Sequence, residues 1–256
     1  MYVFFVLTGF LSVPFLALGA LIEQPLIAGL PFSALQFLAP LAAAVILVSR
    51  REGTHGMLRI ALEAIDVRQA GRPRILLPVL LIMPLIYSAS YVLMIIGGQQ
   101  LPQWRVAGGQ LLLLAVLFFF SAACEEIGWT GYALSPLLSR YGAVMAALVI
   151  GVAWALFHVT ADLQGGHSPE WILWHRVSTV ALRVIIVVAY IGAQSSLFAA
   201  ITVHTMDNVS WASFPNGGSH YDPSVTAPVA LAAAALALLG LRKWRRETLR
   251  PHHPLQ

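Results

Sequence analysis

The chain has 256 residues, of which 59% are hydrophobic and only 10% are charged. An ordinary soluble domain carries about 25% charged residues. The composition therefore excludes a soluble globular enzyme, a disordered chain and a nucleic-acid-binding protein with a wide basic face. The mean hydropathy of +0.79 is typical of a protein with several membrane spans, so the lipid bilayer is the first partner that we expect and nucleic acid is not one.

A helix that crosses a bilayer needs about 20 mostly apolar residues, and eight such segments follow one another with short polar breaks between them. They cover about 2–22, 32–49, 75–98, 109 to beyond 130, 142–161, 177–194, 195–213 and 226–241. The prediction is an all-α fold, a polytopic membrane bundle of about eight transmembrane helices. We expect one integral-membrane domain over residues 1–256, with a motif core at about 109–213. No Lys or Arg precedes Arg50, so the first segment is interpreted as a retained helix and not as a signal peptide.

The basic residues indicate an orientation, because cytoplasmic loops are enriched in Lys and Arg. With eight spans, twelve basic residues fall on one side, two on the other, and Arg183 falls inside the sixth segment. The side that carries twelve holds both termini, so the prediction is a multi-pass protein with both termini cytoplasmic. The twelve are Arg50, Arg51, Arg59, Arg68, Arg72, Arg74, Arg140, Arg242, Lys243, Arg245, Arg246 and Arg250, and the two are Arg105 and Arg176.

Three connecting segments have their own predictions. Residues 57–68 place polar side chains at helical spacing, which fits either a helix in the headgroup plane or a linker helix packed on the bundle. The connections 161–176 and 213–225 are interpreted as ordinary loops, and they include His167, His175 and His220.

Ionisable residues at membrane depth are the informative ones, because each costs at least about 2.5–3.5 kcal/mol at a helix centre on the insertion scale. Glu125 and Glu126 follow a segment without a charged residue that begins after Arg105. Adjacent residues of a helix point about 100° apart, so the two glutamates cannot have the same role. The tunable pKa of a carboxylate suits a general base. The alternative is a buried pair that holds helices together.

Two further segments add polar groups to the same predicted site. His158 follows Trp154 by four residues, and His204 precedes Asn208 by four, so each pair shares one face of a helix. The imidazole and the carboxamide can both donate hydrogen bonds towards a developing oxyanion. Ordinary interhelical hydrogen bonding is the alternative for both pairs.

Arg183 must reach an interface or pair with an acid. Its candidate partners are Glu126, Glu125 and Asp207, and we expect a charge-balancing role.

These residues together match hydrolysis by an activated water, with a carboxylate base, an imidazole that shares the water and donors for the oxyanion. Cys124 is an alternative nucleophile, but no nearby cation or helix N-terminus is predicted to activate it. The predicted boundaries place Glu125 near mid-depth and His158 near the non-cytoplasmic end of its segment. Convergence therefore requires that the helix continue to about residue 165 or that it be broken.

The order of three motifs resembles a membrane family, often called the CPBP (or ABI) family. It includes the CAAX prenyl endopeptidases of the Ras-converting type and the bacteriocin-processing or immunity proteins. The paired-glutamate motif matches Glu125-Glu126-Ile127-Gly128-Trp129-Thr130-Gly131-Tyr132. The Phe-x-x-x-His motif matches Trp154 to His158, and the His-x-x-x-Asn motif matches His204 to Asn208.

The resemblance implies an intramembrane, glutamate-dependent endopeptidase. It implies that Glu125 activates the water with help from His158, that His204 and Asn208 stabilise the oxyanion, and that Glu126 supports the site. It implies no cofactor, although the Glu and His side chains could chemically ligate a divalent metal such as zinc. The implied substrate is a peptide or a membrane-tethered protein, lipidated or not, cleaved near its C-terminus.

The chain departs from the family pattern at two positions. Thr130 stands where the family usually has Arg, and Arg183 is hypothesised to supply the missing charge. Trp154 stands where Phe is usual, a change expected to matter little. The alternative function is a non-catalytic membrane protein, either a transporter-like proton relay or an immunity or chaperone-like partner.

Overall fold

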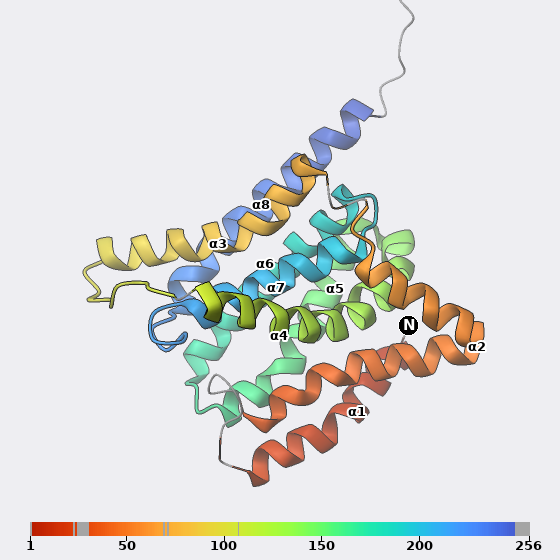
Figure 1. Cartoon of the computed structure of the whole chain (residues 1–256), viewed down its shortest axis with the longest axis horizontal. Helices are drawn as coiled ribbons and strands as arrows, with labels where there is room; N and C mark the ends of the chain where they lie inside the picture. The colour runs from red at the N-terminus through yellow and green to blue at the C-terminus, as the bar shows by residue number, and fades with distance from the viewer. Residues whose placement is uncertain are drawn as a thin grey trace, which may run out of the picture.

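A computed structural model of the protein describes residues 2–22, 24, 31–68, 70, 72–106 and 108–248. Every regular element in these ranges is a helix (Figure 1), which confirms the predicted all-α fold. In chain order they are α1 (Tyr2–Leu21), the short 3₁₀ helix η2 (Phe32–Phe37), α2 (Leu38–Ile65), α3 (Pro73–Ile96), α4 (Gly108–Glu126), the π-helix η3 (Ile127–Leu134), α5 (Ser135–Gln164), α6 (Pro169–Gly192), α7 (Leu197–Ser213) and α8 (Pro223–Thr248).

Within the described part of the chain, six helical stretches are long and apolar enough to cross a bilayer. The predicted number of about eight spans is larger because it divides one of these stretches into two spans and includes α7. Helices α4, η3 and α5 follow one another without a loop and count as one stretch of 57 residues, and α7, with 17 residues, is shorter than a full span. The protein is a multi-pass integral membrane protein.

The long stretch bends back on itself at Gly142, where the backbone leaves the helical region with φ 74° and ψ 175° (Figure 1). Glycine adopts positive φ without the steric cost that a Cβ adds. Glu126 precedes Gly142 by 16 residues and His158 follows it by 16, so the return brings these two side chains to a similar depth. Helix α5 continues to Gln164. This length is one of the two conditions under which Glu125 and His158 were expected to converge.

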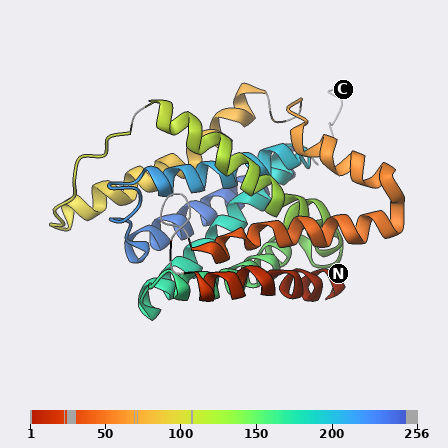
Figure 2. The ribbon, with the colours of Figure 1, turned by 60° about the horizontal axis from the view of Figure 1, so that its bottom comes forward.

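The helices at the centre of the bundle are α6 and α7. Residues 181–187 of α6 and 199–205 of α7 are buried without interruption, so each helix is covered on every face at that level. Figures 1 and 2 show α7 beside α4 and α6, and it packs against both. The outer helices α1, α3 and α4 expose large apolar side chains such as Phe10, Leu85 and Phe120, as expected of surfaces that face lipid.

Residues 57–65 of the segment 57–68 lie in the second limb of α2, after a break at Gly53 with φ 63°. On one side, Ile60 and Ala64 are buried against Leu197 and Ile201 of α7, so this limb is packed on the bundle. Its other side exposes apolar residues: Leu58, Leu62 and Ile65. In the loop that follows, Arg68 donates to Asp66 and lowers the pKa of that carboxyl to about 2.

The predicted loop at 161–176 is wrong over most of its length. Helix α6 begins at Pro169, eight residues before the predicted start of its segment, so His175 lies inside a helix. Ser168 accepts a hydrogen bond from the backbone of Trp171, and Pro169 and Glu170 occupy the first turn. These are ordinary signals of a helix start, and the low hydropathy of the segment obscured them. The connection at 213–225 is a loop between Ser213 and Pro223, as predicted.

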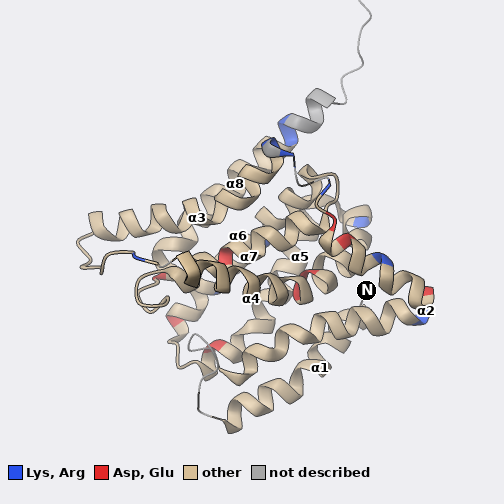
Figure 3. Cartoon of the chain, viewed as in Figure 1, with Lys and Arg blue, Asp and Glu red and all other residues tan. Residues whose placement is uncertain are grey.

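Basic residues are unevenly distributed over the bundle. In Figure 3 basic residues are visible on α2, at the start of α3, near the end of α8 and on the loop before α4. Arg176 is not on a loop, because it lies within α6 with its side chain 11% exposed. Arg250 and the side chains of Arg245 and Arg246 lie outside the described residues.

Close helix packing predicts that Gly128 tolerates no side chain. A Cβ at this position would lie 2.6 Å from the backbone oxygen of Pro40 in α2, whereas a Cβ at Gly9 would meet nothing within 4 Å. Gly128→Ala should lower the stability by about 1–3 kcal/mol, measured as a lower thermal midpoint in detergent. Gly9→Ala is the control and should not destabilise the protein. Equal midpoints for the two variants would contradict this packing.

Candidate active site

Glu126 accepts four hydrogen bonds in the centre of the bundle. Arg183 binds both of its carboxylate oxygens, with Nη1 2.7 Å from Oε2 and Nη2 2.9 Å from Oε1. Thr130 donates to Oε2 at 2.5 Å and His204 Nδ1 lies 3.0 Å from Oε1. The side chains of Glu126 and Arg183 are both 0% exposed. Two-point Arg–carboxylate contacts are strong and directional, so Glu126 is a paired anion with its hydrogen-bonding capacity in use.

Glu125 lies in a different environment although it is the next residue. Trp154 Nε1 donates to its Oε2 at 2.5 Å, and His158 Nε2 lies 3.9 Å from the same oxygen. Its Oε1 has no hydrogen-bond donor among the described residues, and the side chain keeps 7% of its exposure. The two glutamates therefore differ as their adjacent positions on a helix predict, and only Glu125 has an oxygen left for another molecule.

The tautomer of His158 follows from its partner. Its Nδ1 lies 2.9 Å from the backbone oxygen of Trp154. A carbonyl oxygen only accepts, so Nδ1 carries the proton, and in the neutral ring Nε2 is an acceptor. This acceptor lies on the side of Glu125, and the ring is 25% exposed.

His204 and Asn208 lie one helical turn apart on α7, as predicted. His204 is buried and its Nδ1 faces the carboxylate of Glu126, so only Nε2 remains for another partner. Asn208 is half-buried, and its carboxamide has no hydrogen-bond partner among the residues that the structure describes.

Of the three acids considered for Arg183, Glu126 is the one it binds. Asp207 instead accepts a bond from Tyr87 at 3.3 Å.

Trp154 contributes more than the sequence analysis expected. The expectation that a Trp in place of Phe changes little does not hold, because its N–H binds Glu125, a bond that Phe cannot make. Its ring also lies 4.2 Å from the guanidinium carbon of Arg183. One signal was available in the sequence, since a buried indole N–H normally finds a hydrogen-bond acceptor.

A second buried ion pair lies one turn beyond His158 on α5. Arg176 Nε is 3.0 Å from Asp162 Oδ2, and Arg176 Nη2 donates to His175 Nδ1 at 2.7 Å. Arg176 and His175 lie in the segment 161–176 that was predicted to be a loop, so this cluster was not expected.

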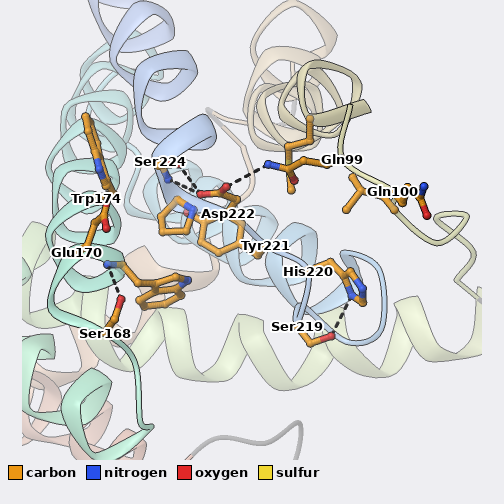
Figure 4. A pocket seen from close by; sticks show the side chains of 14 residues that line it. Gln99, Gln100, Ser168, Glu170, Trp174, Ser219, His220, Tyr221, Asp222 and Ser224 are labelled. Carbon is orange, nitrogen blue, oxygen red and sulfur yellow. Dashed lines mark hydrogen bonds between the residues drawn. The ribbon is translucent and has the colours of Figure 1, made fainter. Parts of the chain in front are cut away.

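A cavity of about 540 Å³ lies where α3 ends and where α6 and α8 begin (Figure 4). None of its lining residues belongs to the three motifs. The two acidic residues that line it have structural roles. Asp222 accepts hydrogen bonds from Ser224 and Gln99, and Glu170 lies in the first turn of α6. Burial raises the pKa of the Tyr221 hydroxyl in its wall. Asp222 and Glu170 lie at the starts of helices. We therefore place the candidate active site at Glu125 and Glu126 and not in this cavity.

The sequence leaves open a divalent metal such as zinc at the Glu and His side chains. A catalytic zinc ion usually takes three protein ligands. Among the described residues, no group of three or more His, Cys, Asp or Glu side chains is arranged to hold a metal ion.

Comparison with known proteins supports the motif assignment. Residues 107–210 match the model of the Type II CAAX prenyl endopeptidase Rce1-like family. The match includes all three motifs, and the resemblance predicted from them is confirmed. The chain is also 27% identical over 145 residues to the CAAX prenyl protease 2 of Methanococcus maripaludis, an alignment that covers 52% of this chain and 54% of that protein. The chain thus matches about half the length of this curated relative.

Removal of Arg183 should destabilise the protein strongly, because Glu126 would remain as an uncompensated buried charge. Arg183→Leu should cost about 3–5 kcal/mol and appear as a lower thermal midpoint in detergent. The control is Arg59→Leu, which removes ion pairs to Glu52 and Glu63 that are 43–46% exposed. It should cost less than about 1 kcal/mol. Equal effects of the two substitutions would contradict the assigned importance of the buried pair.

The hypothesis that Arg183 replaces the usual motif arginine has its own test. Thr130 already touches Glu126, so an arginine at position 130 starts beside the same carboxylate. The double variant T130R/R183L should regain part of the midpoint that R183L loses, while T130R alone should be less stable than wild type because two cations compete for one anion. A double variant no more stable than R183L would refute the replacement.

Proposed function

We propose that this protein is an intramembrane endopeptidase that hydrolyses a peptide bond with a water activated by Glu125. One observation carries the proposal: of two adjacent buried glutamates, Glu126 has four donors while Glu125 has an unpaired oxygen and some remaining exposure. A general base needs such an oxygen within hydrogen-bond reach of the water.

His158 supports the same assignment. A water beside Glu125 can donate one hydrogen to Oε1 and the other to His158 Nε2, which leaves an oxygen lone pair free for attack. The water oxygen then bonds to the carbonyl carbon while Glu125 takes the proton. Return of that proton to the leaving nitrogen completes C–N cleavage and gives a carboxylic acid and an amine.

The oxyanion of the tetrahedral intermediate requires donors, and α7 offers two. The carboxamide of Asn208 is unpaired in the described structure and donates in any protonation state. His204 donates through Nε2 when that nitrogen carries a proton, and its Nδ1 lies 3.0 Å from Glu126 Oε1. Arg183 and Glu126 hold the His204 ring in place and have no direct part in proton transfer.

The proposed substrate is a peptide or membrane-tethered protein with a prenylated C-terminal segment. The name of the matched family and that of the archaeal relative both refer to CAAX prenyl substrates. An active site inside an apolar bundle is compatible with such a substrate, because a lipid-modified peptide partitions into the bilayer. We also infer that both termini face the cytoplasm, from the predominance of basic residues on α2, the start of α3 and the end of α8.

Glu125→Gln tests the proposal. Gln is isosteric, and its amide oxygen can still accept from Trp154, so the variant should fold with an unchanged thermal midpoint. Loss of the base should lower hydrolysis by about 100-fold or more. The assay uses purified protein in nanodiscs with a farnesylated peptide ending in a CAAX sequence and the same peptide without the lipid.

The matched control is Glu63→Gln, which makes the same change at an exposed position of α2 and should retain wild-type activity. Wild-type rates in E125Q, or no cleavage of either peptide by the wild-type protein, would contradict the proposal.

A further inference from the structure

Trp154 contacts four of the ionisable side chains at the candidate site: Glu125, Arg183, His158 and His204. Its indole Nε1–H donates to Glu125 Oε2 at 2.5 Å, and its ring centroid lies 4.2 Å from the guanidinium carbon of Arg183. The rings of His204 and His158 meet it edge to face, with centroids 4.9 Å and 5.5 Å away. The side chain thus lies between the Glu125 and Glu126 halves of the site.

Its N–H is the sole donor to Glu125 in the described part of the chain, whereas Glu126 has four. A carboxylate can rotate about its terminal bond and exchange its two oxygens, because that torsion is broad and two-fold. A donor bound to one oxygen fixes the plane of the group. Without this bond, Glu125 would be a buried carboxylate that no described residue holds in position.

We propose that Trp154 is a positioning residue, whose N–H occupies Oε2 of Glu125 so that Oε1 faces the attacking water. This inference rests on the proposed function, because positioning concerns the same carboxylate. The arginine over the ring face withdraws electron density and makes the N–H a stronger donor, a cooperative effect expected of hydrogen-bonded groups in a low dielectric.

The aromatic face and the N–H edge of Trp154 can be separated by substitution. Phenylalanine, which the family pattern has at this position, keeps a ring beside Arg183, His158 and His204 but removes the donor. If packing alone mattered, Trp154→Phe would be nearly silent. If the N–H positions Glu125, W154F would have a defect in the chemical step.

The kinetic test compares W154F with Trp129→Phe. Trp129 is as buried as Trp154, and its Nε1 has no partner among the described residues, so W129F controls for the loss of ring volume. We expect W154F to lower kcat by about 10- to 100-fold, from the strength of a hydrogen bond to a charged group, with KM changed less than about twofold. W129F should keep its kcat. Equal kcat values for the two variants would overturn the inference.

A spectroscopic test needs no activity. The seven tryptophans each give an indole ¹⁵N–H signal, and the one absent from W154F belongs to Trp154. In E125Q this signal should move strongly upfield, because a neutral amide is a weaker acceptor than a carboxylate, while the signal of Trp129 stays in place. A Trp154 signal that does not respond to E125Q would show that the bond is absent. If E125Q retains full hydrolysis, the proposed function fails even where the bond is found.

Discussion

The buried pair of Arg183 and Glu126 is the interaction on which the rest of the site depends. A lone charge at this depth would cost several kcal/mol. Here the guanidinium of Arg183 binds both oxygens of Glu126, and Thr130 and His204 make the remaining hydrogen bonds to that carboxylate. The pair joins the end of α4 to α6, and through His204 to α7. It thereby links α4 to the two central helices, which follow it by more than 40 residues in the sequence.

The pair also separates the roles of two chemically identical neighbours. Glu126 has no capacity left for a substrate, while Glu125, 100° round the helix, meets one indole N–H and an imidazole whose acceptor nitrogen faces it. The π-helix η3 begins directly after Glu126. Such wide turns occur often at functional sites, and this one contains Gly128, which lets α2 approach closely. The two side chains are chemically identical, so the difference between their proposed roles comes from the residues that surround each of them.

Much of this could be predicted from the sequence, and the failures have physical causes. The apolar segments predicted membrane-spanning helices. The isolated charges of Glu126 and Arg183 predicted that each side chain has a partner inside the bundle. The partner of Arg183 could not be chosen from three acids, since that depends on helix rotation. His175 and Arg176 were placed in a loop because hydropathy is low there, although Ser168 and Pro169 start a helix. The bond from Trp154 to Glu125 depends on the return of α5 after Gly142, a tertiary feature that no local pattern encodes.

A double-mutant cycle on the central pair tests this account most directly. Glu126→Leu, Arg183→Leu and the double variant E126L/R183L are compared with wild type by unfolding in the same detergent. The account predicts that each single substitution destabilises strongly, whereas the double variant recovers at least about 2 kcal/mol relative to the sum of the two, because it buries no unpaired charge. Additive losses would show that the two charges do not depend on each other and would contradict the account.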